Sequence, residues 1–432
     1  MTTAIATAPS VSHRVAAQRQ RTGLPFACVI GDLSMVRALG RCGIPVAVAT
    51  PAPGSDVTRS RYCRAVVEIP DVVDDPAGAV RAIVAWARQQ AHAPVLFYQG
   101  DHDLLALSRH RAELAPHARC LLPPADLVEN CVDKLRFAAL AVRLSLPVPR
   151  SRLLHRGSAA REIGAWNCFP CVLKPAVRTR WSESPLVRRA GTSGQKVLHV
   201  RDRAELEALV PLIDGQQTDF LLQSYIAGGE DRIVSYHAYV RPGGETVAEF
   251  TGRKLRTAPR RYGLSTYVEI TDEPAVKAQG RTAVERLRLS GVVKMDFKQD
   301  GDGRLHLLEV NPRFNLWHHP GSLAGVCLPE LVYRDCLEPG SARPARAVRP
   351  GVRWLKARDD WRALACDPGP QDPSLARWLW QAVTATVNED LLWRDLRPAF
   401  DDLLGTARRR LSRWMRAAAA IAAGRRGRSP CS

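Results

Sequence analysis

The chain has 432 residues, which is enough for roughly three domains. Hydrophobic residues make up 46% and charged residues 24%, the balance of an ordinary globular protein, so a chain that is disordered throughout is excluded. Sixty-two Lys and Arg against 43 Asp and Glu leave a formal net charge of +19. This excess favours anionic partners, namely nucleotides, phosphorylated substrates, nucleic acid or an acidic membrane surface, and does not choose among them.

The N-terminal part of the chain predicts a parallel α/β domain. Residues 1–22 are rich in Ala, Thr and Ser and predict a flexible tail. From residue 23 to 124, apolar strands alternate with helical segments, which is typical of a parallel sheet covered by helices. The turn at Gly31-Asp32 lacks the GxGxxG spacing of a dinucleotide site. Asp101 follows the last strand, where it can either face a ligand or cap the next helix.

Eleven cysteines are scattered along the chain, and the N-terminal segment lacks the apolar core of a secretory signal. We therefore expect reduced thiols and a cytoplasmic protein. No apolar run approaches the ~20 residues of a membrane span. Cys168 and Cys171 have CxxC spacing, but no second pair accompanies them, so we predict that both occupy strand positions and do not bind zinc.

Three lysines stand out in the next part of the chain. Lys134 lies in a strong helix predicted over residues 125–144. Lys174 ends an apolar strand, from which it can either extend to solvent or neutralise a phosphate. Lys196 closes a Gly/Ser loop whose backbone N–H groups can wrap phosphates.

A strand that runs into a Gly-Gly turn follows these lysines. The backbone from Gln223 to Tyr225 and Ile226 can read the edge of an adenine, and Glu230 can accept hydrogen bonds from ribose hydroxyls. A strand–turn–strand connection without a ligand explains the same pattern, and we favour that alternative when the segment is taken alone.

The strongest feature is a predicted hairpin with a Gln299-Asp-Gly-Asp-Gly turn. Asp296 lies on its first strand, and Glu309 and Asn311 lie on the second. Residues two apart on a strand project to the same face, so these oxygen-bearing side chains can converge. Two carboxylates and an amide oxygen suit Mg²⁺ held against phosphates. A hairpin with a merely polar surface is the weaker alternative.

The composition changes again near Gly340. Residues 341–432 carry 18 Lys and Arg against 9 Asp and Glu, together with several tryptophans, and we predict a basic helical extension. From Leu403 onward there are eight arginines and no acid. The run Arg408–Arg416 mixes arginine with aromatic and apolar residues, which fits contact with an anionic membrane or nucleic acid, whereas a solvated tail is the alternative.

Taken in order, these motifs resemble the ATP-grasp superfamily of carboxylate–amine ligases, and within it the predicted ATP-grasp carboligases, with D-aspartate ligase as a relative. The resemblance spans about residues 23–340. It implies an N-terminal α/β domain at 23–124, a two-lobed ATP-grasp domain at 125–340 and a basic extension at 341–432. The motifs that carry it are Lys134, Val-Leu-Lys174-Pro, the Gly-rich loop, Gln223-x-Tyr-Ile-x-Gly-Gly-Glu230, Asp296, and Glu309-Val-Asn-Pro-Arg313.

The resemblance implies a role for each site residue. The ATP-binding residues would be Lys134, Lys174 and Lys196 on the phosphates, Gln223, Tyr225 and Ile226 on adenine, Glu230 on ribose, and Lys254 facing the γ-phosphate. Asp296, Glu309 and Asn311 would hold Mg²⁺, with two ions expected and Mn²⁺ as an alternative. Lys294 and Arg313 would stabilise the transition state, Lys294 standing where relatives carry arginine.

The implied reaction joins a small-molecule carboxylate to an amine through an acyl phosphate and releases ADP and phosphate. Loops at 176–196 and 253–263 are the predicted lids that exclude water, and for the second of them a solvated basic loop is the open alternative. The alternative is a basic protein that binds a membrane surface or nucleic acid and has a non-catalytic ATP-grasp fold. The intact metal set argues against it, and the lack of a nucleic-acid-binding motif makes nucleic acid the weaker partner. Peripheral contact of the tail with an anionic inner membrane surface fits its charge, and a homo-oligomer stays an open alternative.

Overall fold

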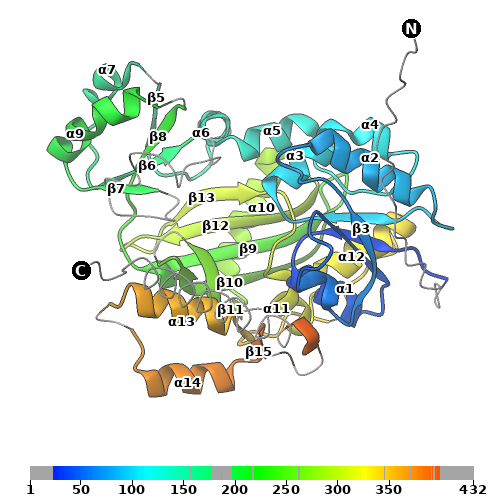
Figure 1. Ribbon diagram of the computed structural model, residues 1–432. Coiled ribbons are helices and arrows are strands. Elements are labelled where there is room, and N and C mark those ends of the chain that lie inside the picture. Colours follow the sequence, from blue (N-terminus) through cyan, green and yellow to red (C-terminus); the bar gives the residue numbers. More distant parts are fainter. Residues whose placement is uncertain are drawn as a thin grey trace, which may run out of the picture.

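The computed structural model describes residues 23–398 apart from 156, 177–185, 187–196, 217, 261–262, 345, 370–371, 391 and 393–394. Three sheets and the helices around them make up this part of the chain (Figure 1). None of the helices described is both long enough and apolar enough to cross a membrane. The predicted flexible tail, Lys196, most of the predicted lid at 176–196 and the arginine-rich run after Leu403 lie outside the described residues.

The N-terminal domain is built on a four-stranded parallel sheet in the order β3-β2-β1-β4, which confirms the predicted α/β domain. Its central strands are short runs of Ala, Val, Ile and Cys that are buried along almost their whole length, as is typical of a parallel sheet between helices. The elements are β1 (Ala27–Ile30), α1 (Leu33–Arg41), β2 (Val46–Thr50), η1 (Val57–Arg59), β3 (Cys63–Glu68), α2 (Pro76–Ala87), β4 (Val95–Tyr98), α3 (Asp101–Arg109) and α4 (Arg111–Leu114).

The helix predicted over residues 125–144 is two helices, α5 (Ala125–Val132) and α6 (Lys134–Arg143), so the prediction of one continuous helix was wrong. Asp133 has a non-helical backbone, and its Oδ1 accepts hydrogen bonds from the N–H groups of Leu135 and Arg136 at 2.8 and 3.1 Å. Aspartate satisfies free N–H groups at a helix start and is a poor interior residue, so it divides the segment. The break makes Lys134 the first residue of α6.

A small lobe follows, built on an antiparallel sheet in the order β5-β8-β6-β7. Leu and Val side chains of this sheet pack against α7 and α9 in a core of their own. The lobe projects from the rest of the molecule beside α6 and β13 (Figure 1). Its elements are β5 (Ser151–Leu154), α7 (Ala159–Ile163), β6 (Cys171–Pro175), β7 (Leu198–Val200), α9 (Arg203–Asp214) and β8 (Phe220–Ser224). Cys171 occupies a strand position as predicted, whereas Cys168 lies outside the strand.

The central sheet has seven strands in the order β13-β12-β9-β10-β11-β14-β15. On β12 the apolar side chains of Val293, Met295 and Phe297 join the core that holds α10. Because side chains alternate along a strand, Lys294 and Asp296 face the opposite side. The elements are η3 (Glu230–Arg232), β9 (Ile233–Val240), β10 (Thr246–Ala258), β11 (Leu264–Thr271), α10 (Pro274–Leu287), β12 (Gly291–Gln299), β13 (Leu305–Asn311), α11 (His318–Leu323) and α12 (Leu328–Leu337).

The N-terminal domain packs on that opposite side of the central sheet, against α11 and α12. Phe97 of β4 packs on Phe314 with the rings tilted and their centres 5.1 Å apart, and one continuous core joins the N-terminal strands to Phe250 and Trp317. The carboxyl edge of the N-terminal sheet is thereby held close to the polar side chains of β12. The boundaries predicted at residues 124 and 340 stay predictions.

The sequence predicted a helical extension after Gly340, but the structure has strands there as well as helices. β14 (Arg353–Leu355) pairs with β11, and β15 (Val387–Asn388) pairs with β14, so the extension adds two strands to the central sheet. Strands of three and two residues are too short to leave an alternating pattern in the sequence. The predicted helices are present as α13 (Ala357–Cys366) and α14 (Leu375–Thr384).

A buried ion-pair network ties this extension to the N-terminal domain. Arg37 of α1 is only 1% exposed, and its guanidinium donates to Glu389 Oε1 at 2.6 Å and to Asp395 Oδ2 at 3.0 Å. Glu389 Oε2 also lies 2.8 Å from His319 Nδ1 and accepts from Trp354 Nε1. A buried network of this kind stabilises the fold only while it is complete, because loss of one side chain leaves the charge of its partner buried and uncompensated.

We expect Arg37→Met to lower the free energy of unfolding by about 3–5 kcal/mol, since Asp395 would stay buried without the guanidinium and Glu389 would keep only its contacts with His319 and Trp354. Urea denaturation at pH 7 measures the effect, and Arg143→Met, at an exposed position of α6, serves as the control that keeps the parent midpoint. Equal midpoints for the two variants would contradict the prediction.

The same network predicts a loss of stability in acid. Burial alone would raise the pKa of Glu389, but His319 and Arg37 outweigh it and hold that pKa at about 2, below the ordinary 4.5. The contribution of this carboxylate is therefore complete above pH 4.5 and is lost as the pH falls toward 2. Unfolding free energies measured from pH 7 to pH 3 should show this fall in the parent and a smaller fall in the Arg37 variant.

Candidate active site

A cavity of about 210 Å³ lies between the small lobe and the central sheet. One part of its wall is apolar, with Val172, Leu221 and Ile233 among its residues, and it suits a flat aromatic group. The other part is polar and charged. It contains many of the residues predicted from the sequence: Lys134, Lys174, Gln223, Tyr225, Ile226, Lys254, Asp296, Glu309, Asn311 and Arg313.

Lys174 reaches the cavity from β6 and is held there by a short chain of hydrogen bonds. Its Nζ donates to Gln223 Oε1 at 2.6 Å, and Gln223 Nε2 donates to Ser151 Oγ at 3.0 Å. Burial lowers the pKa of Lys174 to about 8, with the charge of Lys134 acting in the same direction. Among the residues that the structure describes, no carboxylate accepts a hydrogen bond from this ammonium, so an anion in the cavity would stabilise its charge.

Asp296 is the centre of the charged part of the site. Its Oδ2 accepts hydrogen bonds from Lys254 Nζ at 2.7 Å and from Lys294 Nζ at 2.6 Å, and its Oδ1 accepts one from Ser235. All four side chains come from three adjacent strands, β9, β10 and β12, and Asp296 is almost completely buried. Strand pairing alone therefore brings them together.

The two lysines respond differently to this carboxylate. Burial opposes the charge on Lys254, but Asp296 and Glu309 outweigh it and raise its pKa. For Lys294 burial prevails, and its pKa is lowered although Asp296 favours the charged form. Burial would raise the pKa of Asp296, but Lys254 and Lys294 together hold it well below its usual range. The aspartate is thus ionised at neutral pH and neutralised by cations on two sides.

The predicted metal ligands meet across the β12–β13 hairpin. Asp296 and Glu309 are direct partners in the strand register, and Asn311 pairs with Lys294. Glu309 is 49% exposed, and its Oε1 lies 4.0 Å from Lys294 Nζ. Two carboxylates and an amide oxygen that border one cavity match the oxygen ligands that Mg²⁺ and Mn²⁺ prefer. The residues present therefore fit such an ion, while the number of ions stays a prediction.

Arg313 connects the hairpin to the N-terminal domain. Its Nε donates to Asp101 Oδ1 at 2.5 Å, and its Nη2 donates to Asn311 Oδ1 at 3.2 Å. Asp101 is the first residue of α3 and borders the cavity, whereas the free N–H group of Gly100 is capped by Asp103. Of the two predicted roles of Asp101, the structure supports the one that faces the ligand cavity.

Two predicted site residues lie beside the cavity without bordering it. Lys294 is buried behind Asp296, and Lys254 occupies the more accessible position. Glu230 lies in η3, where its Oε1 accepts a hydrogen bond from Thr257. The roles predicted for these two residues stay predictions, as do those of the residues that border the cavity.

The predicted lid at 253–263 was wrong for most of its length. Residues from Arg253 to Ala258 belong to β10, which pairs with β9 on one side and with β11 on the other. The basic side chains that suggested a loop alternate along a strand and take ion-pair partners: Lys254 pairs with Asp296, and Arg256 pairs with Asp360 of α13. Charge density alone does not distinguish a solvated loop from a strand with buried ion pairs.

A second cavity of about 310 Å³ lies at the carboxyl end of β1, between the N-terminal domain and the extension. Asp32, Arg37, Lys356, Arg358 and Asp390 are among its lining residues. Gln99 lies between residues of the two cavities. Its side chain hydrogen-bonds to Asp32 of the second cavity, at the end of β1, and Asp101 of the first cavity follows Gln99 by two residues at the end of β4. Open α/β sheets bind ligands at this edge.

Sequence reasoning missed two further residues of the first cavity. Lys298 borders it, donates to the Gly228 carbonyl at 2.7 Å and lies 4.7 Å from the centre of the Tyr225 ring. Its spacing from Asp296 was a usable signal, because residues two apart share a strand face. Ser151 has no such signal, since only strand pairing places it beside Gln223.

Comparison with known families agrees with this architecture. A family model described as ATP-grasp in the biosynthetic pathway with Ter operon matches residues 245–357. That range contains Lys254, Lys294, Asp296 and the Glu309–Arg313 segment. The chain is 26% identical over 223 residues to a D-alanine–D-alanine ligase of Stutzerimonas stutzeri, a match that covers 49% of this chain and 67% of the relative. Four similar ligases from Neisseria are matched over 57% of their length.

Solved structures show the same fold at low identity. An ADP complex of N5-carboxyaminoimidazole ribonucleotide synthetase superimposes with a TM-score of 0.56 and 18% identity over 76% of this chain and 81% of that one. An L-amino acid ligase from Bacillus licheniformis gives a TM-score of 0.54 and 16% identity over 76% and 79%. At such identities the likeness establishes the fold alone.

Proposed function

Because this chain is a member of the ATP-grasp superfamily, we propose that it is an ATP-dependent ligase that joins a carboxylate to an amine through an acyl phosphate. ADP and phosphate are the other products. The observation that carries the proposal is the single cavity in which the oxygen ligands Asp296, Glu309 and Asn311 face the lysines on the other wall. Such a set matches the charge of a nucleoside triphosphate with its metal ion and has little use in a protein that only binds surfaces.

The nucleotide would lie across the cavity from the apolar to the charged wall. Val172 and Leu221 offer apolar contacts to adenine, beside the backbone of Tyr225 and Ile226. Lys134 and Lys174 would bind the phosphates, and Lys254 would lie near the γ-phosphate because it is anchored on Asp296. Glu230 would bind the ribose from η3.

The reaction requires positive charge where the phosphoryl group is transferred and where the tetrahedral intermediate forms. Mg²⁺ held by Asp296, Glu309 and Asn311 would neutralise phosphate charge when bound. Arg313 is oriented by Asp101 and Asn311, so its guanidinium is fixed before substrate arrives. Lys294 supports the site through Asp296 and stays buried in the structure. Exclusion of water protects the acyl phosphate from hydrolysis.

The second cavity gives room for a substrate beside the nucleotide. Its wall carries both cations and carboxylates, including Lys356, Arg358 and Asp390, and therefore suits a small molecule with groups of both charges. Its position favours this assignment, because Asp32 in its wall is hydrogen-bonded to Gln99, which is close in sequence to Asp101 of the first cavity.

We expect the purified protein to release ADP and phosphate only when a carboxylate and an amine are both present. Lysines and oxygen ligands that gather on the phosphates favour attack at the γ-phosphorus, whereas adenylation would expose the α-phosphorus and release pyrophosphate. A screen of amino acids and other small carboxylates and amines, read by ion-exchange separation of the nucleotides, identifies a productive pair. Hydroxylamine in place of the amine should trap the acyl phosphate as a hydroxamate.

Glu309→Gln is the matched control for that screen, because it removes one metal ligand at a half-exposed position. It should give neither ADP nor hydroxamate under the same conditions. AMP as the main nucleotide product would overturn the acyl-phosphate mechanism. Release of ADP without an amine and without a hydroxamate would indicate a kinase or an ATPase.

A further inference from the structure

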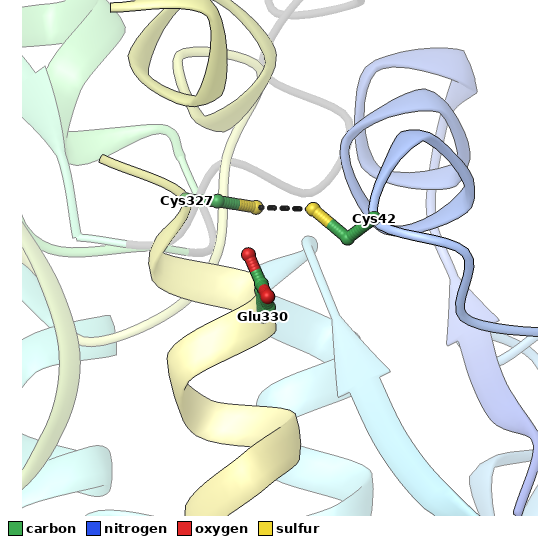
Figure 2. A group of neighbouring side chains, drawn as sticks. All are labelled: Cys42, Cys327 and Glu330. Carbon is green, nitrogen blue, oxygen red and sulfur yellow. Dashed lines mark hydrogen bonds between the residues drawn. The ribbon is translucent and has the colours of Figure 1, made fainter. Parts of the chain in front are cut away.

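Two cysteines and a glutamate meet where the N-terminal domain packs on α12. Cys42 directly follows α1, Cys327 directly precedes α12, and their sulfurs lie 3.6 Å apart. Glu330, in the first turn of α12, directs its carboxylate toward the two sulfurs (Figure 2). One ligand atom from each residue lies within 4.8 Å of the other two. The three residues do not line either cavity, so the nucleotide site does not account for them.

We propose that Cys42, Cys327 and Glu330 bind a thiolate-preferring metal ion, with Zn²⁺ the best match. Zn²⁺ binds cysteine sulfur at about 2.3 Å in tetrahedral sites, which places two sulfur ligands about 3.8 Å apart. The observed 3.6 Å is close to that edge, so the thiols need little movement to bind. Glu330 supplies the third ligand, and a water molecule or a small ligand completes the tetrahedron.

The surroundings balance the charge of the bound ion. Binding replaces the two thiol protons, which leave to solvent, and the weak S–H contacts with the Ala38 carbonyl at 3.4 and 3.8 Å are given up. Zn²⁺ with two thiolates and one carboxylate has a net charge of −1. Arg334 already pairs with Glu330 Oε1 at 2.7 Å and supplies one positive charge. The N-terminus of α12, at Cys327, further favours a thiolate there.

Such an ion would act as a clamp between parts of the chain that are far apart in sequence. Cys42 belongs to the N-terminal domain, whereas Cys327 and Glu330 belong to the segment after the β12–β13 hairpin. Cys42 and Cys327 are 285 residues apart in the sequence. Metal binding would therefore stabilise the contact of α1 with α12, one of the contacts by which the N-terminal domain packs on the rest of the chain.

Co²⁺ titration of the full chain, stripped of metal with a chelator and kept reduced, tests this site. We expect one tightly bound ion per chain, a thiolate-to-cobalt charge-transfer band in the near ultraviolet, displacement by Zn²⁺, and a rise in melting temperature on adding Zn²⁺. Cys42→Ser and Cys327→Ser should each weaken binding by about 100-fold or more and abolish the rise in melting temperature. Glu330→Gln should keep the charge-transfer band at a lower affinity.

Cys366→Ser, at an exposed cysteine outside the cluster, is the matched control and should behave as the parent. A parent protein without the charge-transfer band would overturn the proposal. So would equal affinity for Co²⁺ in the parent and in both cysteine variants of the cluster. A Cys42–Cys327 disulfide found by mass spectrometry in protein purified without reductant, together with no metal binding by the reduced protein, would replace the metal site with a redox pair.

Discussion

Asp296→Asn is expected to abolish turnover and also to lower the free energy of unfolding by about 3–5 kcal/mol. The amide keeps the shape of the side chain and its contact with Ser235, but it removes the negative charge that lies between two ammonium groups. Lys254 and Lys294 would then face each other in a buried site with only the half-exposed carboxylate of Glu309 nearby. Loss of activity and loss of stability therefore have one electrostatic cause.

Comparison with Glu309→Gln separates the two effects. Glu309 is half exposed and no lysine depends on it as closely, so this variant should lose metal-dependent turnover while it keeps the melting temperature of the parent. Thermal melting and a Mg²⁺ titration of turnover measure both properties. If Asp296→Asn melts like the parent, the lysines are neutralised by another group. If Glu309→Gln saturates with Mg²⁺ like the parent, Glu309 is not a metal ligand.

Lys174→Met is expected to weaken binding of ATP by roughly 2–4 kcal/mol, or about 30- to 1000-fold, without unfolding the protein. A charge-assisted hydrogen bond to phosphate would be lost in a part-buried site. The fold does not need the ammonium, because its only hydrogen-bond partner among the described residues is the neutral Gln223. Calorimetric titration with a non-hydrolysable ATP analogue measures the affinity, and an unchanged affinity would remove Lys174 from the nucleotide site.

The lowered pKa of Lys174 adds a dependence on pH. The group is mostly protonated at pH 7, and because its pKa is about 8, the free protein loses this charge as the pH rises above 8. Binding of phosphate would then require uptake of a proton, so affinity should fall by up to tenfold for each pH unit above 8. Lys174→Arg keeps its charge through this range and should show a flatter profile. Parallel profiles for the two proteins would contradict the assignment.

Local sequence determined the hairpin and the strands that carry the predicted metal ligands. Alternating apolar and polar residues on β12 and a glycine-rich turn predict the hairpin, but the register set at the turn pairs Phe297 with Leu307, and a bulge at the next step brings Asp296 opposite Glu309. The parallel N-terminal sheet was equally readable, because its buried strands are nearly continuous apolar runs. The ordered motifs then indicated an ATP-grasp fold, which the comparisons confirm.

Only the tertiary structure shows which segments that are far apart in the chain contact each other. The sequence singled out Cys168 and Cys171 by their spacing, yet the thiols that meet are Cys42 and Cys327. Arg37 likewise has no sequence signal that points to Glu389, because an arginine in a helix is ordinarily solvated and only packing removes it from water. Alternation along a strand or a helix determines which face a side chain occupies, whereas the partner on that face depends on how the sheets and helices pack together.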